Sequence, residues 1–312
     1  MIPINFEPIN EIKMSFSSST IPGSISCCSI AHRRTVPTPL GNPGVFVGHT
    51  RLGTIPKTRK WTEIVGLFTG TTPAGVLSEP SNIASIAAAT LDATKEGLNR
   101  ATADCGVRYT FYLLTQIALA SRTSDFETTL RKHGIQITSD STVLDLATEL
   151  QDAIDRYVKR NPFGATDASE IAQKAAGQAM VNVMTSGTGK LFPSETDVRD
   201  AVRPLSTRKG FGELGQQFFG NFVARFLNFY LSRVTATTLG GPRLRDLMDV
   251  AEFNRSLQAH CNQSARIVRD FCGEWYSKTE YQKGIDLENT SGFLSVAVNK
   301  LRSELTQQRE EM

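Results

Sequence analysis

The first candidate for chemistry is the stretch VMTSGTGKLF, residues 183–192, which contains GTGK, the tail of a phosphate-binding loop. A complete loop of that kind has a glycine five residues before the glycine of the GK pair, a Ser or Thr after the lysine for Mg²⁺, and a preceding strand. In this sequence Met184 stands where the first glycine is required, and Leu191 stands where Ser or Thr is required. The preceding residues have the pattern of a helix and not of a strand. We therefore predict a helix that stops at Gly187, with Lys190 near its negative end, and no nucleotide site.

A second motif, GFGELG at residues 210–215, matches the GxGxxG pattern of dinucleotide-binding folds. In those folds the glycines follow a hydrophobic strand, and an acidic residue about 20 positions further on binds the ribose. Here VRPLSTRK precedes the motif, and the later segment FLNFYLS contains no carboxylate. We therefore interpret the glycines as part of a helix entrance, where Gly215 allows close packing of a neighbouring helix.

Two clusters of basic residues could bind phosphate or a nucleic-acid backbone. The first lies in IPKTRKW, residues 55–61, beside Trp61, and the second lies in RPLSTRK, residues 203–209, on the expected N-terminal side of a helix. Basic side chains and free backbone amides at a helix start form an anion site. A solvated basic loop is the alternative for both clusters. The candidate anion-binding or nucleic-acid-binding residues are Lys57, Arg59, Lys60, Arg203, Arg208 and Lys209.

Histidines and carboxylates give no pattern of a catalytic or metal site. None of the 4 histidines belongs to an HExxH motif or an i, i+4 pair, and no GxSxG elbow is present. Asp145 and Glu149 lie on the expected polar face of a helix, where we expect them to be solvated. We predict no catalytic residue, no metal ligand and no cofactor, and an enzyme with an unrecognised site is the third functional hypothesis. The histidines are His32, His49, His133 and His260, the last beside an apolar stripe where packing is expected.

The 5 cysteines are an odd number without a CxxC pair, which argues against a disulfide framework. Cys261 and Cys272 lie eleven residues apart. On one helix this spacing corresponds to roughly three turns and places both thiols on the same face. We expect buried, reduced thiols in a reducing cytosol, with a metal or redox role as the alternative.

The composition is that of a globular protein of 312 residues, with 40% hydrophobic and 21% charged residues. The formal net charge of +3, from 34 basic and 31 acidic side chains, does not by itself indicate a polyanion-binding protein. The sequence contains no run of about 18 uncharged apolar residues, so we predict no membrane-spanning helix. We expect a cytoplasmic protein.

The N-terminal region differs from the rest of the chain. Residues 14–62 contain no Asp or Glu, and the segment SFSSSTIPGSISCCSIAHRR has the composition of an organelle transit peptide. We favour a disordered tail, partly because Glu7 and Glu11 precede the segment. Organelle targeting is the alternative for localisation, and Met14 could equally be the true start.

The remaining pattern is helical almost without interruption from Trp61 onward, and we predict an all-α fold, an irregular multi-helix bundle with a loosely structured N-terminal arm. The expected organisation is an extended or disordered arm at residues 1–58, an N-terminal helical block at 59–162 and an aromatic-rich C-terminal helical block at 163–312. The phenylalanine-rich segment 218–234 has a narrow polar stripe, so we place it at the centre of the C-terminal core.

Three further expectations concern single helices. One helix is expected over NIASIAAATLDATKEGLNRA, residues 82–101, and one long helix carries a buried stripe from Phe253 to Trp275. Asp167 and Glu170 resemble a capping box and are expected to open the helix that leads into the GTGK segment.

The leading functional hypothesis is a non-enzymatic helical adaptor or scaffold subunit, whose arm and aromatic-rich helices bind other protein chains in a hetero-complex or copies of the same chain in a homo-oligomer. Bacterial multi-gene systems, including phage-defence assemblies, often contain helical subunits without motifs of their own, and the hypothesis includes a complex of that kind. The alternative is a nucleic-acid-associated module that uses the basic loops at 57–60 and 203–209.

Overall fold

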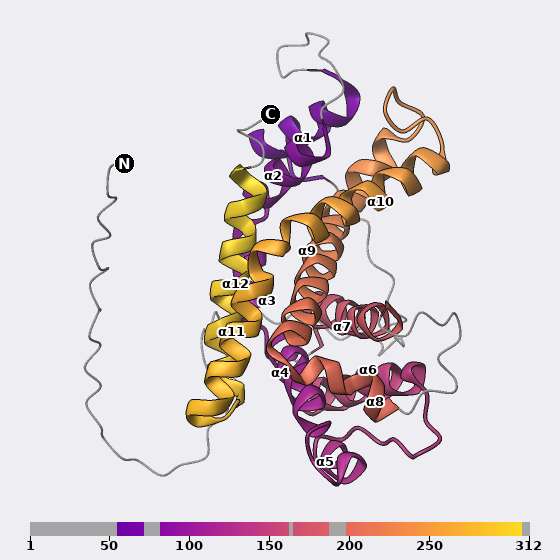
Figure 1. Ribbon diagram of the computed structural model, residues 1–312. Helices are drawn as coiled ribbons and strands as arrows, with labels where there is room; N and C mark the ends of the chain where they lie inside the picture. Colours follow the sequence, from indigo (N-terminus) through magenta and orange to yellow (C-terminus); the bar gives the residue numbers. More distant parts are fainter. Residues whose placement is uncertain (1–54, 72–81, 162–164, 187–197, 308–312) are drawn as a thin grey trace, which may run out of the picture. The chain divides into compact units, whose positions relative to one another are not determined.

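The computed structural model describes residues 55–71, 82–161, 165–186 and 198–307. The chain divides into two units, Met1–Asn42 and Pro43–Met312, and every described residue belongs to the second. The predicted arm, apart from residues 55–58, lies outside the described part, as do Gly187 and Lys190. Figure 1 shows the described part as helices joined by turns and loops, and the predicted all-α class is confirmed.

Several of the helices are separated from the next by a single residue. In chain order they are α1 (Arg59–Thr69), α2 (Ile83–Ala93), α3 (Lys95–Ala103), α4 (Cys105–Ala120), α5 (Phe126–Lys132), α6 (Val143–Arg160), α7 (Asp167–Ser186), α8 (Val198–Val202), the 3₁₀ turn η2 (Arg203–Ser206), α9 (Arg208–Thr238), α10 (Leu247–Ser264), α11 (Arg266–Lys283) and α12 (Leu287–Gln307). Between α9 and α10, Leu239 and Leu244 form an isolated bridge.

The long helix α9 is central to the packing, because α7, α10 and α11 all lie against it (Figure 1). Its residues Phe218 and Phe219 are fully buried, and both rings lie 5.3 Å from the ring centroid of Phe111 on α4. Clustered aromatic rings bury a large apolar area and add specific edge and face contacts. The central position predicted for residues 218–234 is therefore confirmed, although the helix extends beyond that segment at both ends.

A glycine lets α11 approach α9 closely. A Cβ atom added at Gly215 would lie 2.6 Å from the Sγ atom of Cys272 and 2.8 Å from its Cβ atom. Both distances are shorter than any van der Waals contact, so only a residue without a side chain fits there. This confirms the close packing expected at Gly215, and the other glycines of the GFGELG segment lie in the first turns of α9.

The prediction of one continuous helix over residues 82–101 is wrong, because α2 ends at Ala93 and α3 begins at Lys95. Thr94, between them, is buried, and its hydroxyl donates a 2.7 Å hydrogen bond to the carbonyl of Thr90. A threonine that bonds back to its own helix bends or ends it, because the hydroxyl competes with the backbone donors for that carbonyl. After the break, α3 packs mainly against α12 and α4.

The long helix expected from Phe253 to Trp275 is also divided, at Ala265, into α10 and α11. Ala265 is fully buried, and α10 and α11 each pack on α9 along a different direction (Figure 1). Ile267, just past the break, has an exposed fraction of 46%. The prediction of one continuous buried stripe is therefore wrong, because the pattern continues across a change of helix axis.

The start of α7 differs from the expected capping box by one residue. The Thr166 amide donates to the Ser169 hydroxyl oxygen at 3.1 Å, and the Ser169 amide donates to the Thr166 hydroxyl oxygen at 3.0 Å. This reciprocal pair satisfies two amides at the helix start, so Asp167 and Glu170 are not needed for it. Glu170 instead forms an ion pair with Lys174 at 2.5 Å.

Helices from both sides of the expected division at residues 162 and 163 contribute to one hydrophobic core. Phe111 of α4, for example, stacks on Phe293 of α12 with ring centroids 5.5 Å apart. The division into two helical blocks stays a prediction. Among the described helices, none combines the length and apolar character that crossing a membrane requires.

Candidate anion-binding cleft

The first basic cluster stands at the start of α1, which a buried tryptophan anchors. Trp61 is 7% exposed, and its ring lies 6.4 Å from that of Tyr230 on α9. Arg59 and Lys60, the two residues before it, are exposed. Because Trp61 fixes the first turn against α9, the two basic side chains are held at one place on the surface.

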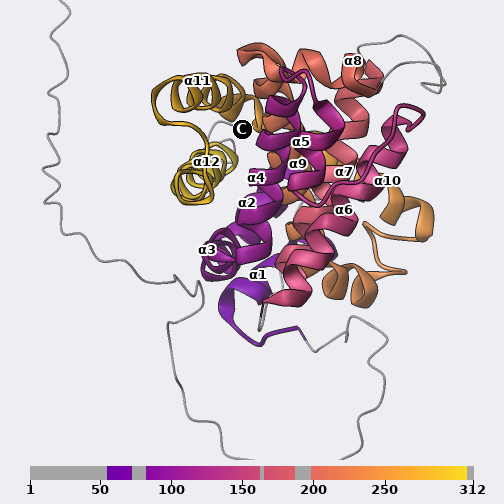
Figure 2. The ribbon, with the colours of Figure 1, turned by 90° about the horizontal axis from the view of Figure 1, so that it is seen from below.

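These side chains border a cleft of about 590 Å³ between the start of α1, the junction of α2 with α3, and the C-terminal part of α9. At this junction α2, which packs against α1, leads into α3 (Figure 2). We call it the basic cleft. Its charged lining residues are Arg59, Lys60, Lys95, Arg100 and Arg233, together with the acidic residues Asp92 and Glu96.

The basic cleft has an excess of positive charge, because five basic and two acidic side chains line it. Among the described residues of this lining, only Lys60 has an acidic partner within ion-pair distance, Asp92, at 2.8 Å. This pair is about half exposed on both sides, so water screens it and it contributes little to stability. Within the described part of the chain, the other four cations have no carboxylate partner and are available for an anion.

An aromatic group forms the floor of the basic cleft. Tyr230 is half-buried, and its ring centroid lies 5.0 Å from that of Phe226 and 5.2 Å from that of Phe229. Gly97 on α3 makes room for it, because a Cβ atom there would lie 2.6 Å from the Tyr230 hydroxyl oxygen. Any larger residue at position 97 would therefore push the tyrosine out of its place.

No match was found when the sequence was compared with protein-family models, with curated proteins and with solved structures. An all-α bundle supports many unrelated activities, so the fold by itself does not indicate a function.

The second basic cluster has a different environment. Arg208 donates to the Glu274 carboxylate at 2.6 Å, and Arg203 lies 4.0 Å from Asp200. The hydroxyl of Thr207 accepts a 3.0 Å hydrogen bond from the Gly210 amide, one of the donors that an anion at this helix start would use. Two cations and one amide of the helix end thus have partners within the protein.

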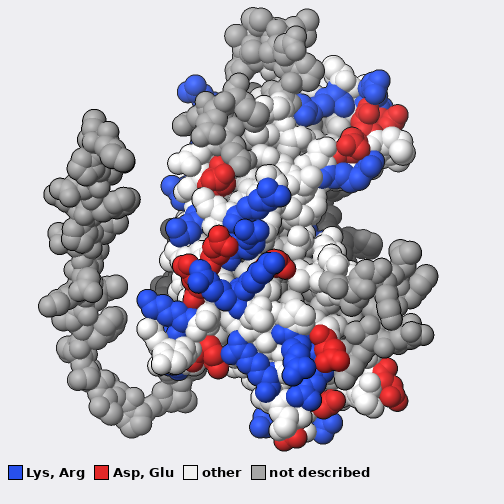
Figure 3. All heavy atoms as spheres, in the orientation of Figure 1, with Lys and Arg blue, Asp and Glu red and all other residues white. Residues whose placement is uncertain are grey.

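The two basic clusters lie far apart, because they are associated with opposite parts of α9. Arg208 and Arg233 are separated by roughly 37 Å along the axis of a regular helix. Lys209 is exposed, and Lys57 is exposed but does not line the basic cleft. Figure 3 shows basic and acidic side chains intermixed on one face of the molecule.

Sequence reasoning missed Lys95, Arg100 and Arg233 as members of the site. Lys95 and Arg100 lie within a predicted helix, where isolated cations are common, and Arg233 lies in a segment that reads as core. No local spacing connects them with Arg59. The nearest signal is the glycine at position 97, which marks a close approach but does not name its partner.

Asp145, Glu149 and His260, which were considered for catalysis from the sequence, have contacts that support the fold. Asp145 forms a capping box with Thr142, and these hydrogen bonds lower the pKa of the Asp145 carboxyl. Glu149 accepts a 3.0 Å hydrogen bond from the Gln136 amide, so both acids have a role beyond the solvated face that we expected. His260 is half-buried, as predicted for a packed or boundary histidine, and burial lowers its pKa.

The two cysteines predicted to be buried are buried, but they lie on α10 and α11 and not on one helix. Burial raises the pKa of Cys261 to about 12 and raises that of Cys272 as well, so both thiols stay protonated near neutral pH. Among the described residues, no group of three or more His, Cys, Asp or Glu side chains is arranged to hold a metal ion.

Proposed function

We propose that the protein is a nucleic-acid-associated binding module without catalytic activity, and that the basic cleft contacts the phosphate backbone. The observation that carries the proposal is the convergence of cations from three parts of the fold. Arg59, Arg100 and Arg233 reach the cleft from α1, α3 and α9, and none of them has a carboxylate partner in the described structure. Uncompensated arginines at one concave site favour a multiply charged anion.

Phosphate suits this lining better than a single carboxylate does. Each arginine presents a planar fork of donors that matches phosphate oxygens, and several such forks can contact successive phosphates of a backbone. Binding releases the counterions condensed on the nucleic acid, which gives affinity that depends steeply on salt. The half-buried ring of Tyr230 at the floor of the cleft adds a surface on which a base or sugar can pack.

The proposal is tested by fluorescence anisotropy of a labelled oligonucleotide with the full chain at increasing salt. We expect binding at low salt that weakens steeply as salt rises. The variant R59Q/R233Q should bind more weakly, and K209Q, which removes an exposed cation of the second cluster, serves as the matched control. Absence of binding at low salt, or equal loss in K209Q, contradicts the proposal.

An adaptor or scaffold subunit of a multi-protein assembly is the second candidate function, and a different observation favours it. Leu247 and Met248, at the start of α10, have exposed fractions of 73% and 70%, and Leu239 nearby is 44% exposed. Large apolar side chains grouped on a surface favour a protein interface, because burying them there releases ordered water. We call these three residues the apolar tip.

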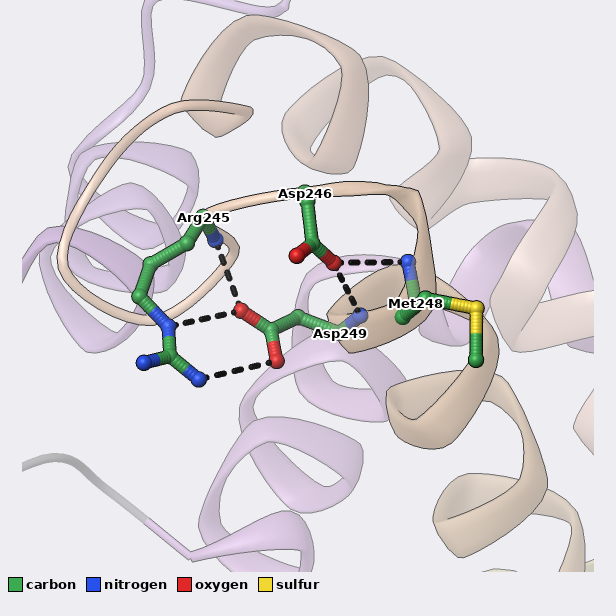
Figure 4. A network of polar contacts seen from close by, with 4 residues as sticks. All are labelled: Arg245, Asp246, Met248 and Asp249. Atoms are coloured by element: carbon green, nitrogen blue, oxygen red, sulfur yellow. Dashed lines mark hydrogen bonds and ion pairs between the residues drawn. The ribbon is translucent and has the colours of Figure 1, made fainter.

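The backbone of the apolar tip is held in place by polar contacts (Figure 4). The Asp246 carboxylate accepts hydrogen bonds from the amides of Met248, at 2.8 Å, and Asp249, at 3.0 Å. Asp249 in turn accepts from the Arg245 guanidinium at 3.0 Å, while the Met248 side chain points away from this network (Figure 4). Such pre-ordering lowers the entropic cost of binding a partner.

The adaptor role is tested by mass measurement and by identification of proteins that copurify with the full chain. A partner should be lost from L247E/M248E and retained by L144E, because Leu144 on α6 is 62% exposed but lies on another helix. A monomeric mass with no copurifying protein contradicts this candidate.

A further inference from the structure

A second, smaller cavity adjoins the basic cleft. It has a volume of about 230 Å³ and shares Gly97, Arg100 and Tyr230 with the cleft. Its other walls come from the end of α3, the start of α7 and α9, so it extends from the cleft toward the start of α7. We call it the base pocket. Its lining includes Ala101, Asp104, Thr166, Ile171, Phe229 and Tyr230.

The walls of the base pocket are mainly apolar and aromatic. Phe229 and Tyr230 are both half-buried, so each ring presents part of its surface, and their planes meet nearly at a right angle, 88°. Ile171 on α7 is partly buried and faces the same space. A flat ring fits such a wall, because aromatic and aliphatic side chains contact both its face and its edge.

The polar end of the base pocket is acidic. Asp104 accepts hydrogen bonds through Oδ1 from the amides of Gly106, at 2.8 Å, and Val107, at 3.0 Å, and through Oδ2 from the Thr166 hydroxyl, at 2.8 Å. A carboxylate has about four lone-pair sites, so Oδ2 retains capacity for one further hydrogen bond. Asp167, also in the lining, is exposed. The pocket thus disfavours phosphate and favours a ring that carries N–H donors.

The two cavities are complementary halves of one site. The basic cleft attracts anions, and the base pocket accepts a flat ring with amino groups. Arg100 and Tyr230 line both, so a ligand that occupies both halves can contact these two side chains. The volume of about 230 Å³ is below the range of roughly 300–1,000 Å³ for whole small-molecule sites, so the base pocket suits a ring and not a complete ligand.

We infer that the site binds a nucleotide unit of a single-stranded nucleic acid, with the phosphates in the basic cleft and the base in the base pocket. This assignment rests on the proposed function and adds the state of the strand. In a duplex the bases are stacked and paired inside the helix, so none can enter the pocket without being extruded. A single strand offers its bases to aromatic side chains at lower cost.

The experiment compares four probes on the full chain: an oligodeoxyadenylate, the same strand with abasic sites, its duplex with oligothymidylate, and free AMP. We expect the intact single strand to bind about tenfold more tightly than the abasic strand or the duplex. The variant F229L should remove most of this advantage and leave the salt dependence unchanged. F271L is the matched control, because Phe271 is a half-buried aromatic on α11, away from the site.

Each outcome discriminates between the two proposals. Equal affinity for single strand, abasic strand and duplex, with no effect of F229L, overturns the base pocket while the backbone contact stands. No binding of any strand overturns both. AMP binding as tightly as the strand makes the ligand a free nucleotide and overturns the strand assignment. F229Y, which keeps the ring, should retain affinity, so a loss in F229L cannot be attributed to misfolding if F229Y and F271L bind normally.

Discussion

The salt dependence of nucleic-acid binding provides the sharpest test of the basic cleft, because its magnitude follows from the lining. Four of the lining cations have no acidic partner in the described structure: Arg59, Lys95, Arg100 and Arg233. Four phosphate contacts with a single strand give a slope of about −3 in a plot of log K against log salt. Affinity should therefore fall about 50-fold when salt rises fourfold, for example from about 50 to 200 mM.

Removing two of these cations should reduce the slope by a known amount. R59Q and R233Q each remove one contact, so each variant should lower the slope by about 0.7 and the double variant by about 1.4. The double variant should then lose only about sevenfold in affinity over the same salt range. Both side chains are exposed or half-exposed, so the fold should be retained, which circular dichroism and thermal unfolding can confirm.

Anisotropy titrations at several salt concentrations measure the slopes directly. K209Q should keep the wild-type slope, because Lys209 lies outside the basic cleft. The proposed phosphate contacts in the basic cleft are refuted if the double variant keeps the full slope, or if the slope falls as much in K209Q as in R59Q. A slope near zero in the wild-type chain would mean that phosphate contacts do not drive binding.

Three further predictions concern stability. G215A should destabilise the protein by about 1–3 kcal/mol in chemical denaturation, because the added methyl group overpacks against Cys272. C272G should relieve part of this cost in the double variant, so unfolding free energies of the two substitutions that simply add would contradict the contact. D104A should cost about 1–2 kcal/mol, because the Asp104 carboxylate accepts from two amides at the start of α4, and an unchanged denaturation midpoint would exclude that role. Burial lowers the pKa values of His133 and His260 below the usual 6.5, so as pH falls the unfolded chain binds protons at a higher pH than the folded chain does. The free energy of unfolding should therefore fall as pH drops below about 6.5, and this fall should be smaller in H133Q/H260Q.

Local pattern predicted much of the fold because it encodes the class and burial of each helix. The phenylalanines of residues 218–234 indicated a central helix, and their rings do lie in the core. Gly215 indicated a close approach, which Cys272 makes. The helix breaks at Thr94 and Ala265 were not predicted, since a periodic stripe of apolar residues does not show where the helix axis turns.

The candidate site was only partly visible in the sequence. Arg59 and Lys60 were identified from their cluster, but the sequence offered no reason to prefer them over Arg203 and Arg208. The structure separates the two clusters by their partners. Arg208 is paired with Glu274, whereas Arg59 has no carboxylate partner in the described part of the chain.

By itself, the sequence determined that the chain is helical, which helix lies at its centre, and that Cys261 and Cys272 are buried. These properties follow from side-chain periodicity and size, which act over a few turns of one helix. Only the tertiary structure decided that Arg59, Arg100 and Arg233 share a cleft, with a base pocket beside it. The reason is physical: contacts between residues far apart in the chain depend on how helices cross, and the close approach of Gly97 to the Tyr230 hydroxyl is a fit that no local pattern encodes.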